Sequence, residues 1–187
     1  MTINTRPVGA LHDSAAFQGW IDQLERTVND KYVLLASGSF PAATTLSITD
    51  IPEIYSYLHI YWNGASSNTN TRQMLIRVST NNGSSYDSTA SNYVGYQYTG
   101  SAVLDSTLAA LNETGNVASG ATNTGVCVIE GYQEGVYAKY SSMMFANTVR
   151  YAVNGYYAST SNIDAIQFLW NGTGNFDAGT YALYGVR

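Results

Sequence analysis

The chain of 187 residues is long enough for one domain with a sizeable core, and its single cysteine cannot form an internal disulfide. Charged residues make up only 11% of it, and a net charge of −5 disfavours a protein that binds nucleic acid through clustered lysine and arginine. No apolar run approaches the roughly 18 residues of a membrane-spanning helix, and the first residues show no secretory signal. We therefore expect that the chain does not insert into a membrane and that it is made in a reducing cytoplasm.

Residues 1–30 form the first predicted domain, an irregular arm (1–12) followed by an α-helix (13–30). Within the helix, apolar side chains recur at spacings of 4, 3 and 4 residues, which is the pattern of a helical stripe. This stripe either packs on the protein's own sheet or on a neighbouring protein, or it joins a short coiled coil of several chains. Its members are Phe17, Ile21, Leu24 and Val28.

Residues 31–187 form the second predicted domain, in which the apolar pattern changes to a period of two. Such alternation, bounded by Gly, Asn and Ser clusters, predicts about nine strands. Polar loops are expected at 63–71 and 100–125, the second with a short helical turn at 106–111. The strands are expected at 32–37, 44–49, 53–62, 73–80, 93–98, 126–133, 148–157, 163–170 and 180–186. In 53–62, one face carries Ile54, Ser56, Leu58, Ile60 and Trp62, and the other carries Tyr55, Tyr57, His59 and Tyr61.

Strands joined by short turns, with no long helix between them, predict an all-β fold. We expect an antiparallel β-sandwich of jelly-roll type with one N-terminal α-helix. The last predicted strand completes a sheet made earlier in the chain. Trp62 and Trp170 each end an apolar strand before an Asn-Gly pair, so we expect both rings to be scaffold.

Motifs for catalysis and metal binding are missing from the sequence. His12 and His59 lie on different predicted elements, and His59 is expected to be a surface imidazole flanked by tyrosines. No nucleophile elbow, dinucleotide fingerprint or phosphate-binding loop occurs. Glu130 and Glu134 would lie about 13 Å apart on a strand, too far for a glycosidase pair. Cys127 is expected to be a buried small hydrophobe. We therefore expect no enzyme, metal or cofactor.

Tyrosine is the residue type with two open interpretations, because its ring is apolar and its hydroxyl is polar. The 16 tyrosines either pack between sheets and against identical subunits, or some of them form a stacking platform for a glycan. No residue is assigned to glycan binding. Asp177 is expected to cap its own turn. The tyrosines concerned are Tyr55, Tyr57, Tyr61, Tyr93, Tyr96, Tyr98, Tyr132, Tyr137, Tyr140, Tyr156 and Tyr157.

Three stretches resemble the jelly-roll fibre, decoration and minor tail proteins of tailed bacteriophages. They are residues 46–60 with Asp-Ile-Pro between two strands, residues 75–86 with an Arg-bearing strand before an Asn-Asn-Gly turn, and residues 174–186 at the end of the chain. The resemblance implies a virion structural component with no cofactor, made in the host bacterial cytoplasm. It also implies a homo-oligomer, most often a trimer, that contacts other virion proteins, and in some members a host surface glycan.

The leading hypothesis is therefore a bacteriophage virion structural protein, a head or tail fibre or decoration subunit, that acts through assembly. The alternative is a receptor-binding tip that recognises a bacterial surface glycan, and a weaker third interpretation is an enzyme acting on such a polysaccharide. The helix predicted at 13–30 lies outside the three stretches that resemble the phage proteins. We assign its stripe to attachment or oligomerisation.

Overall fold

The computed structural model describes residues 31–187 apart from 71, 100–101, 109, 114–117, 134 and 148. This part of the chain contains twelve strands and one 3-10 helix (Ala90–Asn92), and no α-helix. Eight strands form one sheet: β1 (Tyr32–Ser39), β3 (Tyr57–Ser67), β5 (Tyr93–Thr99), β6 (Ala102–Leu108), β8 (Asn123–Glu130), β9 (Lys139–Ala146), β10 (Val149–Tyr157) and β12 (Phe176–Val186). Four form the other: β2 (Thr45–Ile48), β4 (Met74–Ser79), β7 (Asn112–Glu113) and β11 (Ala165–Trp170).

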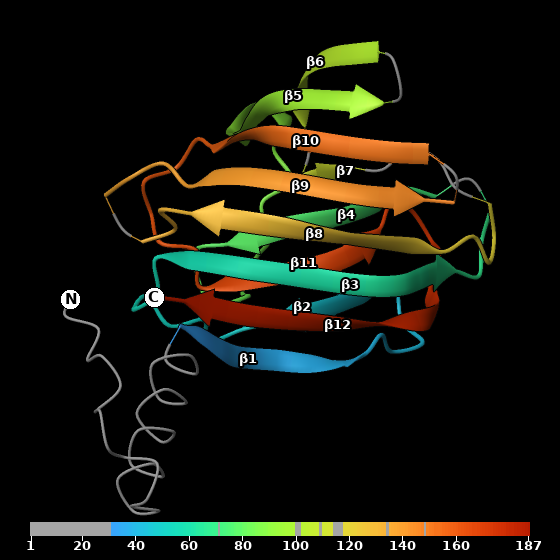
Figure 1. Cartoon of the computed structure of the whole chain (residues 1–187), viewed down its shortest axis with the longest axis horizontal. Helices are drawn as coiled ribbons and strands as arrows, with labels where there is room; N and C mark the ends of the chain where they lie inside the picture. Colours follow the sequence, from blue (N-terminus) through green and yellow to red (C-terminus); the bar gives the residue numbers. More distant parts are fainter. Residues whose placement is uncertain are drawn as a thin grey trace, which may run out of the picture.

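The two antiparallel sheets lie face to face as a β-sandwich (Figure 1). The larger sheet has the order β1-β12-β3-β8-β9-β10-β5-β6, and the smaller has the order β2-β11-β4-β7. The chain changes sheet at every step along it except from β5 to β6, from β8 to β9 and from β9 to β10. The terminal strand β12 lies between β1 and β3, as expected of a strand that completes a sheet.

The core lies between the sheets and is rich in aromatic rings. Phe40, in the connection after β1, stacks on Phe176 at 4.4 Å between centroids and meets Phe168 edge-on at 5.2 Å. Trp62 and Trp170 are both buried, so the prediction that they are scaffold is confirmed. Fully burying one large apolar side chain contributes about 1.5–3 kcal/mol, which makes this aromatic layer a main source of stability.

Two glycines shape the end of the long β3–β12 pair. Gly64 (φ 64°) and Gly179 (φ 107°) both adopt the left-handed region, where a side chain is strained. A Cβ on Gly179 would lie 2.6 Å from the backbone of Ala65, so only glycine fits there. The register shifts at this point, and the strand then continues to Ser67. The loop predicted at 63–71 is wrong in its first five residues because these bulges let β3 continue.

Each predicted strand overlaps an observed one, but three strands were missed. They are β6, β7 and β9, and β8 begins at Asn123 inside the predicted loop. The helical turn predicted at 106–111 is wrong, because residues up to Leu108 pair with β5 instead. Tyr55 does not share a face with Tyr57: it precedes β3, and its ring lies buried against Gly185. The predicted N-terminal helix, with Phe17, Ile21, Leu24 and Val28, lies outside the described residues.

Candidate functional site

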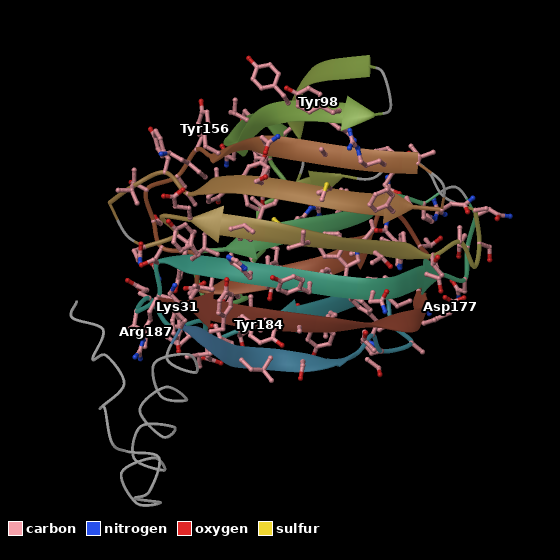
Figure 2. The ribbon with its side chains drawn as sticks, viewed as in Figure 1. Lys31, Tyr98, Tyr156, Asp177, Tyr184 and Arg187 are labelled. Atoms are coloured by element: carbon pink, nitrogen blue, oxygen red, sulfur yellow. The ribbon has the colours of Figure 1, made fainter. Side chains whose placement is uncertain are left out.

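The side of the eight-stranded sheet that faces away from the core is unusually apolar, and we call it the outer face. A solvent-facing antiparallel sheet normally presents polar side chains there. Figure 2 looks onto this face, with Tyr184 toward the β1 edge and Tyr98 and Tyr156 toward the β5 side. Nine large apolar side chains on it are 37–53% exposed: Tyr32, Leu34, Tyr57, Tyr61, Tyr96, Tyr98, Met143, Phe145 and Tyr156.

Register partners form a row across the outer face, which we call the central row. In order along β12, β3, β8, β9, β10 and β5, its residues are Ala182, Tyr61, Val126, Met143, Ala152 and Tyr98. Small and large side chains therefore alternate strand by strand. In this row β3, β9 and β5 form ridges and β12, β8 and β10 form furrows. The neighbouring row differs, with Tyr184 on β12 and Ser141 on β9.

Two hollows lie beside Tyr61 as a result of this alternation. The larger has a volume of about 480 Å³ and is lined by Tyr61, Val126, Met143 and Phe145 among others. The second has a volume of about 350 Å³ and is lined by Tyr32, Tyr61, Ala182 and Tyr184. Both are open to solvent, and their walls are mainly apolar rings and aliphatic chains.

His59 lies at the centre of a tyrosine cluster on the same face. Its ring centroid is 5.5 Å from that of Tyr32, 6.5 Å from Tyr57 and 6.2 Å from Tyr61, and Tyr61 meets Tyr184 edge-on at 5.9 Å. Nδ1 of His59 lies 3.3 Å from the hydroxyl of Tyr61, within hydrogen-bonding distance. Burial among these rings lowers the pKa of His59 and raises that of Tyr61. The prediction of an imidazole flanked by tyrosines is confirmed.

Formal charges are few on the outer face; one of them is Arg150 of β10, the register partner of Phe145. The central row carries none. The next row consists of Leu34, Tyr184, His59, Val128, Ser141, Asn154 and Tyr96 and ends on the edge strand β6 with Asp105. Glu130 and Lys139 are register partners at the end of β8 and the start of β9, one row further along.

The outer side of the four-stranded sheet has the opposite character. Gln167 of β11 donates a hydrogen bond from Nε2 to the hydroxyl of Ser47 on β2, at 3.2 Å. The apolar residues on this side, Leu75 and Leu169, form a small buried cluster with Ala110 from the segment after β6. Exposed aromatic surface is therefore a property of the larger sheet and not of both.

A polar hollow of about 340 Å³ lies between the strands β4 and β10, around Asp87. Burial would raise the pKa of Asp87, but hydrogen bonds from Asn92, Thr89 and Tyr157 outweigh it and hold that pKa below its ordinary value. The hydroxyl of Tyr157 donates to Asp87 Oδ2 at 2.8 Å, and the hydroxyl of Tyr93 donates to the Asp87 carbonyl at 2.9 Å. This carboxylate ties the loop before β5 to the sheet, which is a structural role.

The predictions for the other residues named in the sequence analysis have different outcomes. Cys127 is buried, and burial raises its pKa to about 12, as expected of an inert thiol. Asp177 does not cap a turn: it lies in β12 and accepts a hydrogen bond from the Ser66 hydroxyl. His12 and Glu134 lie outside the described residues. Within the described part, no three His, Cys, Asp or Glu side chains are placed to hold a metal ion.

The tyrosines separate into two sets. Tyr55, Tyr93, Tyr132, Tyr140 and Tyr157 are buried, whereas Tyr57, Tyr61, Tyr96, Tyr98, Tyr137 and Tyr156 are exposed. Burial raises the pKa of Tyr132 to about 12. Met143 and Phe145 were missed because they belong to the unpredicted strand β9, in which polar and apolar residues do not alternate although burial does.

Comparison with known proteins gives no relative: no family model, no curated protein and no solved structure matches the chain. Among the described residues, no helix has the length and apolar character needed to cross a membrane.

Proposed function

We propose that the sandwich is a jelly roll with two added strand pairs. Within the larger sheet, β1-β12-β3-β8 form a block of four neighbours, and β2-β11-β4-β7 form the facing block. Eight strands that alternate between two sheets in this way make the two Greek keys of a jelly roll. The pairs β5–β6 and β9–β10 are insertions that extend one sheet.

We further propose that the chain is a bacteriophage virion structural protein, a head or tail fibre or decoration subunit, that acts through protein–protein contacts. The observation that carries this proposal is the apolar outer face. Its nine large side chains, each about 40–50% exposed and roughly 200 Å² in size, present roughly 800 Å² of mainly apolar surface, the tyrosine hydroxyls included. The largest apolar patch on a typical monomer is about 300–600 Å². Aromatic residues and methionine are also the types enriched at protein interfaces.

The resemblance of three stretches to phage virion proteins agrees with this role. All three stretches form parts of the two blocks, since residues 46–60 include most of β2 and the start of β3, residues 75–86 include most of β4, and residues 174–186 include β12. In such a subunit, residues 1–30 would serve attachment to the rest of the particle or oligomerisation, through the apolar stripe predicted there.

A receptor-binding tip for a bacterial surface glycan is the second candidate function. The hollow beside Tyr61 favours it, because Asn63 and Thr124 add polar groups to the aromatic wall. Sugars need several convergent hydrogen-bonding groups. Much of the remaining wall is formed by Val126, Met143 and Phe145, whose side chains offer no hydrogen-bonding oxygen or nitrogen, so the surface suits a protein partner better than a sugar.

The test of the virion proposal is the composition of the particle. Particles of the phage whose genome carries this chain would be purified on a density gradient, and their proteins identified by mass spectrometry. We expect the chain in many copies per particle. Its absence from particles, while it is present in the lysate, would overturn the proposal.

A truncated chain and a binding assay separate the two candidate functions. A chain lacking residues 1–30 should keep the thermal unfolding of its sandwich and be lost from particles. Titration of host polysaccharide onto the full chain, with Tyr61→Ala as the site variant, should give no binding heat. Binding that Tyr61→Ala abolishes would favour the receptor-binding tip.

A further inference from the structure

We propose that a second copy of this chain packs face to face on the outer face, with the ridges of each copy in the furrows of the other. The inference rests on the proposed assembly function and names its partner. In such a contact the same surface is used by both copies, so the surface must be complementary to itself. The geometry of the central row provides this property.

The alternation of large and small residues makes the face self-complementary. A two-fold axis that lies in the plane of contact, parallel to the strands and between β3 and β8, exchanges β3 with β8 and β12 with β9. It places Tyr61 of each copy over Val126 of the other, and Met143 over Ala182. In the central row, each large side chain of these four strands then meets a small one. This is the interdigitation by which two sheets pack about 10 Å apart.

The hollows of the face lie where this packing needs space. The hollow of about 480 Å³ is lined by Val126 and Ala182, the two furrow residues, with Tyr61, Met143 and Phe145 as walls. The second hollow, of about 350 Å³, extends the space over Ala182 toward Tyr32. A large side chain from a second copy would fill each of them without displacing a ridge.

The exposed area agrees with what a stable pair of proteins needs. Under this axis the seven exposed side chains on β1, β3, β9 and β10 present roughly 600 Å², the low end of the roughly 600–1,000 Å² that each partner contributes to an interface of standard size. Tyr96 and Tyr98 on β5 lie beyond β1 of the other copy. A small ligand would leave most of these side chains in water.

Charge does not oppose the pairing. The chain carries a net charge of −5, yet the central row has no formal charge. Under the same axis Glu130 of one copy faces Tyr57 of the other, because these residues are register partners on β8 and β3. The carboxylate therefore meets a phenol hydroxyl and not a second carboxylate.

The test measures self-association of the full chain by sedimentation velocity at several concentrations. We expect a dimer or a larger closed oligomer that Tyr61→Glu weakens at least about tenfold, because it places a charge in an apolar contact. Ile54→Glu is the matched control, since Ile54 is 65% exposed and lies before β3, and it should leave association unchanged. Circular dichroism checks that each variant is folded. If Tyr61→Glu does not fold, Met143→Glu provides the same measurement.

A swap of side-chain sizes tests complementarity itself. Tyr61→Val alone and Val126→Tyr alone should each weaken association, and the double variant should recover part of it because it exchanges ridge and furrow. A wild-type chain that stays monomeric at about 100 μM would overturn the inference, since a standard interface gives micromolar affinity or better. So would an oligomer that both Glu variants leave intact. If deletion of residues 1–30 turns a monomer into a dimer, the chain's own N-terminal segment covers the outer face in the full chain. The inference fails in that case too.

The outcomes separate this inference from the proposed function. A monomeric chain that is found in purified particles overturns the pairing and leaves the virion proposal standing. A chain that pairs through this face and is absent from particles overturns the virion proposal and leaves the pairing standing.

Discussion

The buried contact between Trp62 and Asn123 lies directly beneath the outer face, and Trp62→Phe tests its strength. The indole Nε1 of Trp62 donates to Oδ1 of Asn123 at 2.9 Å, and both residues are almost fully buried. Nδ2 of Asn123 is buried without a hydrogen-bond partner among the described residues. Within the described part of the chain, the indole N–H therefore satisfies Oδ1 of this amide, and Nδ2 has no partner.

The expected cost follows from two terms. Without the indole N–H, Oδ1 of Asn123 is buried and unpaired, which costs about 1–3 kcal/mol. The smaller phenyl ring buries roughly 50 Å² less apolar surface, which costs about 1 kcal/mol more. We expect Trp62→Phe to lower the free energy of unfolding by about 2–4 kcal/mol. Asn123→Ala should cost at least about 1 kcal/mol less in the Trp62→Phe background than in the wild type.

Urea unfolding monitored by circular dichroism measures both quantities, at a protein concentration held constant across variants. Trp170→Phe is the control, because Trp170 is equally buried and its Nε1 has no partner among the described residues. It should cost only the packing term of about 1 kcal/mol. Equal costs for the two tryptophan variants, or additive costs for Trp62→Phe and Asn123→Ala, would show that the hydrogen bond between Trp62 and Asn123 does not contribute in this way.

Three further predictions concern the polar network around Asp87, the close pairing of strands β5 and β10, and His59. The hydroxyl of Tyr157 donates to Asp87 at 2.8 Å and helps to lower the carboxyl pKa, so Tyr157→Phe should cost about 1 kcal/mol at pH 7. Because a lowered carboxyl pKa contributes stability above its unfolded value of about 3.8, the wild type should lose more stability than the variant as pH falls from 5 toward 3; parallel pH curves would contradict this. In Gly155→Ala, the new Cβ would lie 2.1 Å from the Val94 carbonyl oxygen, and a loss of at least about 2 kcal/mol is expected in urea unfolding; a neutral effect would show that β5 and β10 are not this close. The lowered pKa of His59 disfavours its charged form in the folded state, so stability should fall as pH drops through about 6.5, and His59→Gln should flatten that part of the curve of melting temperature against pH. An unchanged slope in His59→Gln would assign the effect to other groups.

The sequence predicted the strands whose two faces differ in polarity. Residues 57–62 alternate tyrosine or histidine with leucine, isoleucine or tryptophan, and the observed strand places the second set in the core. The strand β9 was missed for a physical reason. It carries Ser142 inward and Met143 and Phe145 outward, so polarity does not alternate although burial does. When the outward residues are also apolar, an alternation in burial produces no alternation of polar and apolar residues in the sequence.

The candidate surface could be predicted only in part for the same reason. Tyr57, His59 and Tyr61 were placed on one face from their spacing. Tyrosine alone does not indicate burial, because its ring suits the core and its hydroxyl suits water: Tyr156 is exposed and its neighbour Tyr157 is buried. The ridges and furrows depend on register across six strands. That register is set by pairings between residues far apart in the chain, such as Tyr61 with Ala182, which no local pattern encodes.

We propose that the outer face of the eight-stranded sheet is a contact surface between copies of this chain in a virion. A cryo-EM reconstruction of the purified particle would test this proposal. We expect density for the sandwich with Tyr61 and Met143 buried against a second copy. A particle in which the sandwich is present and this face points into solvent would contradict it.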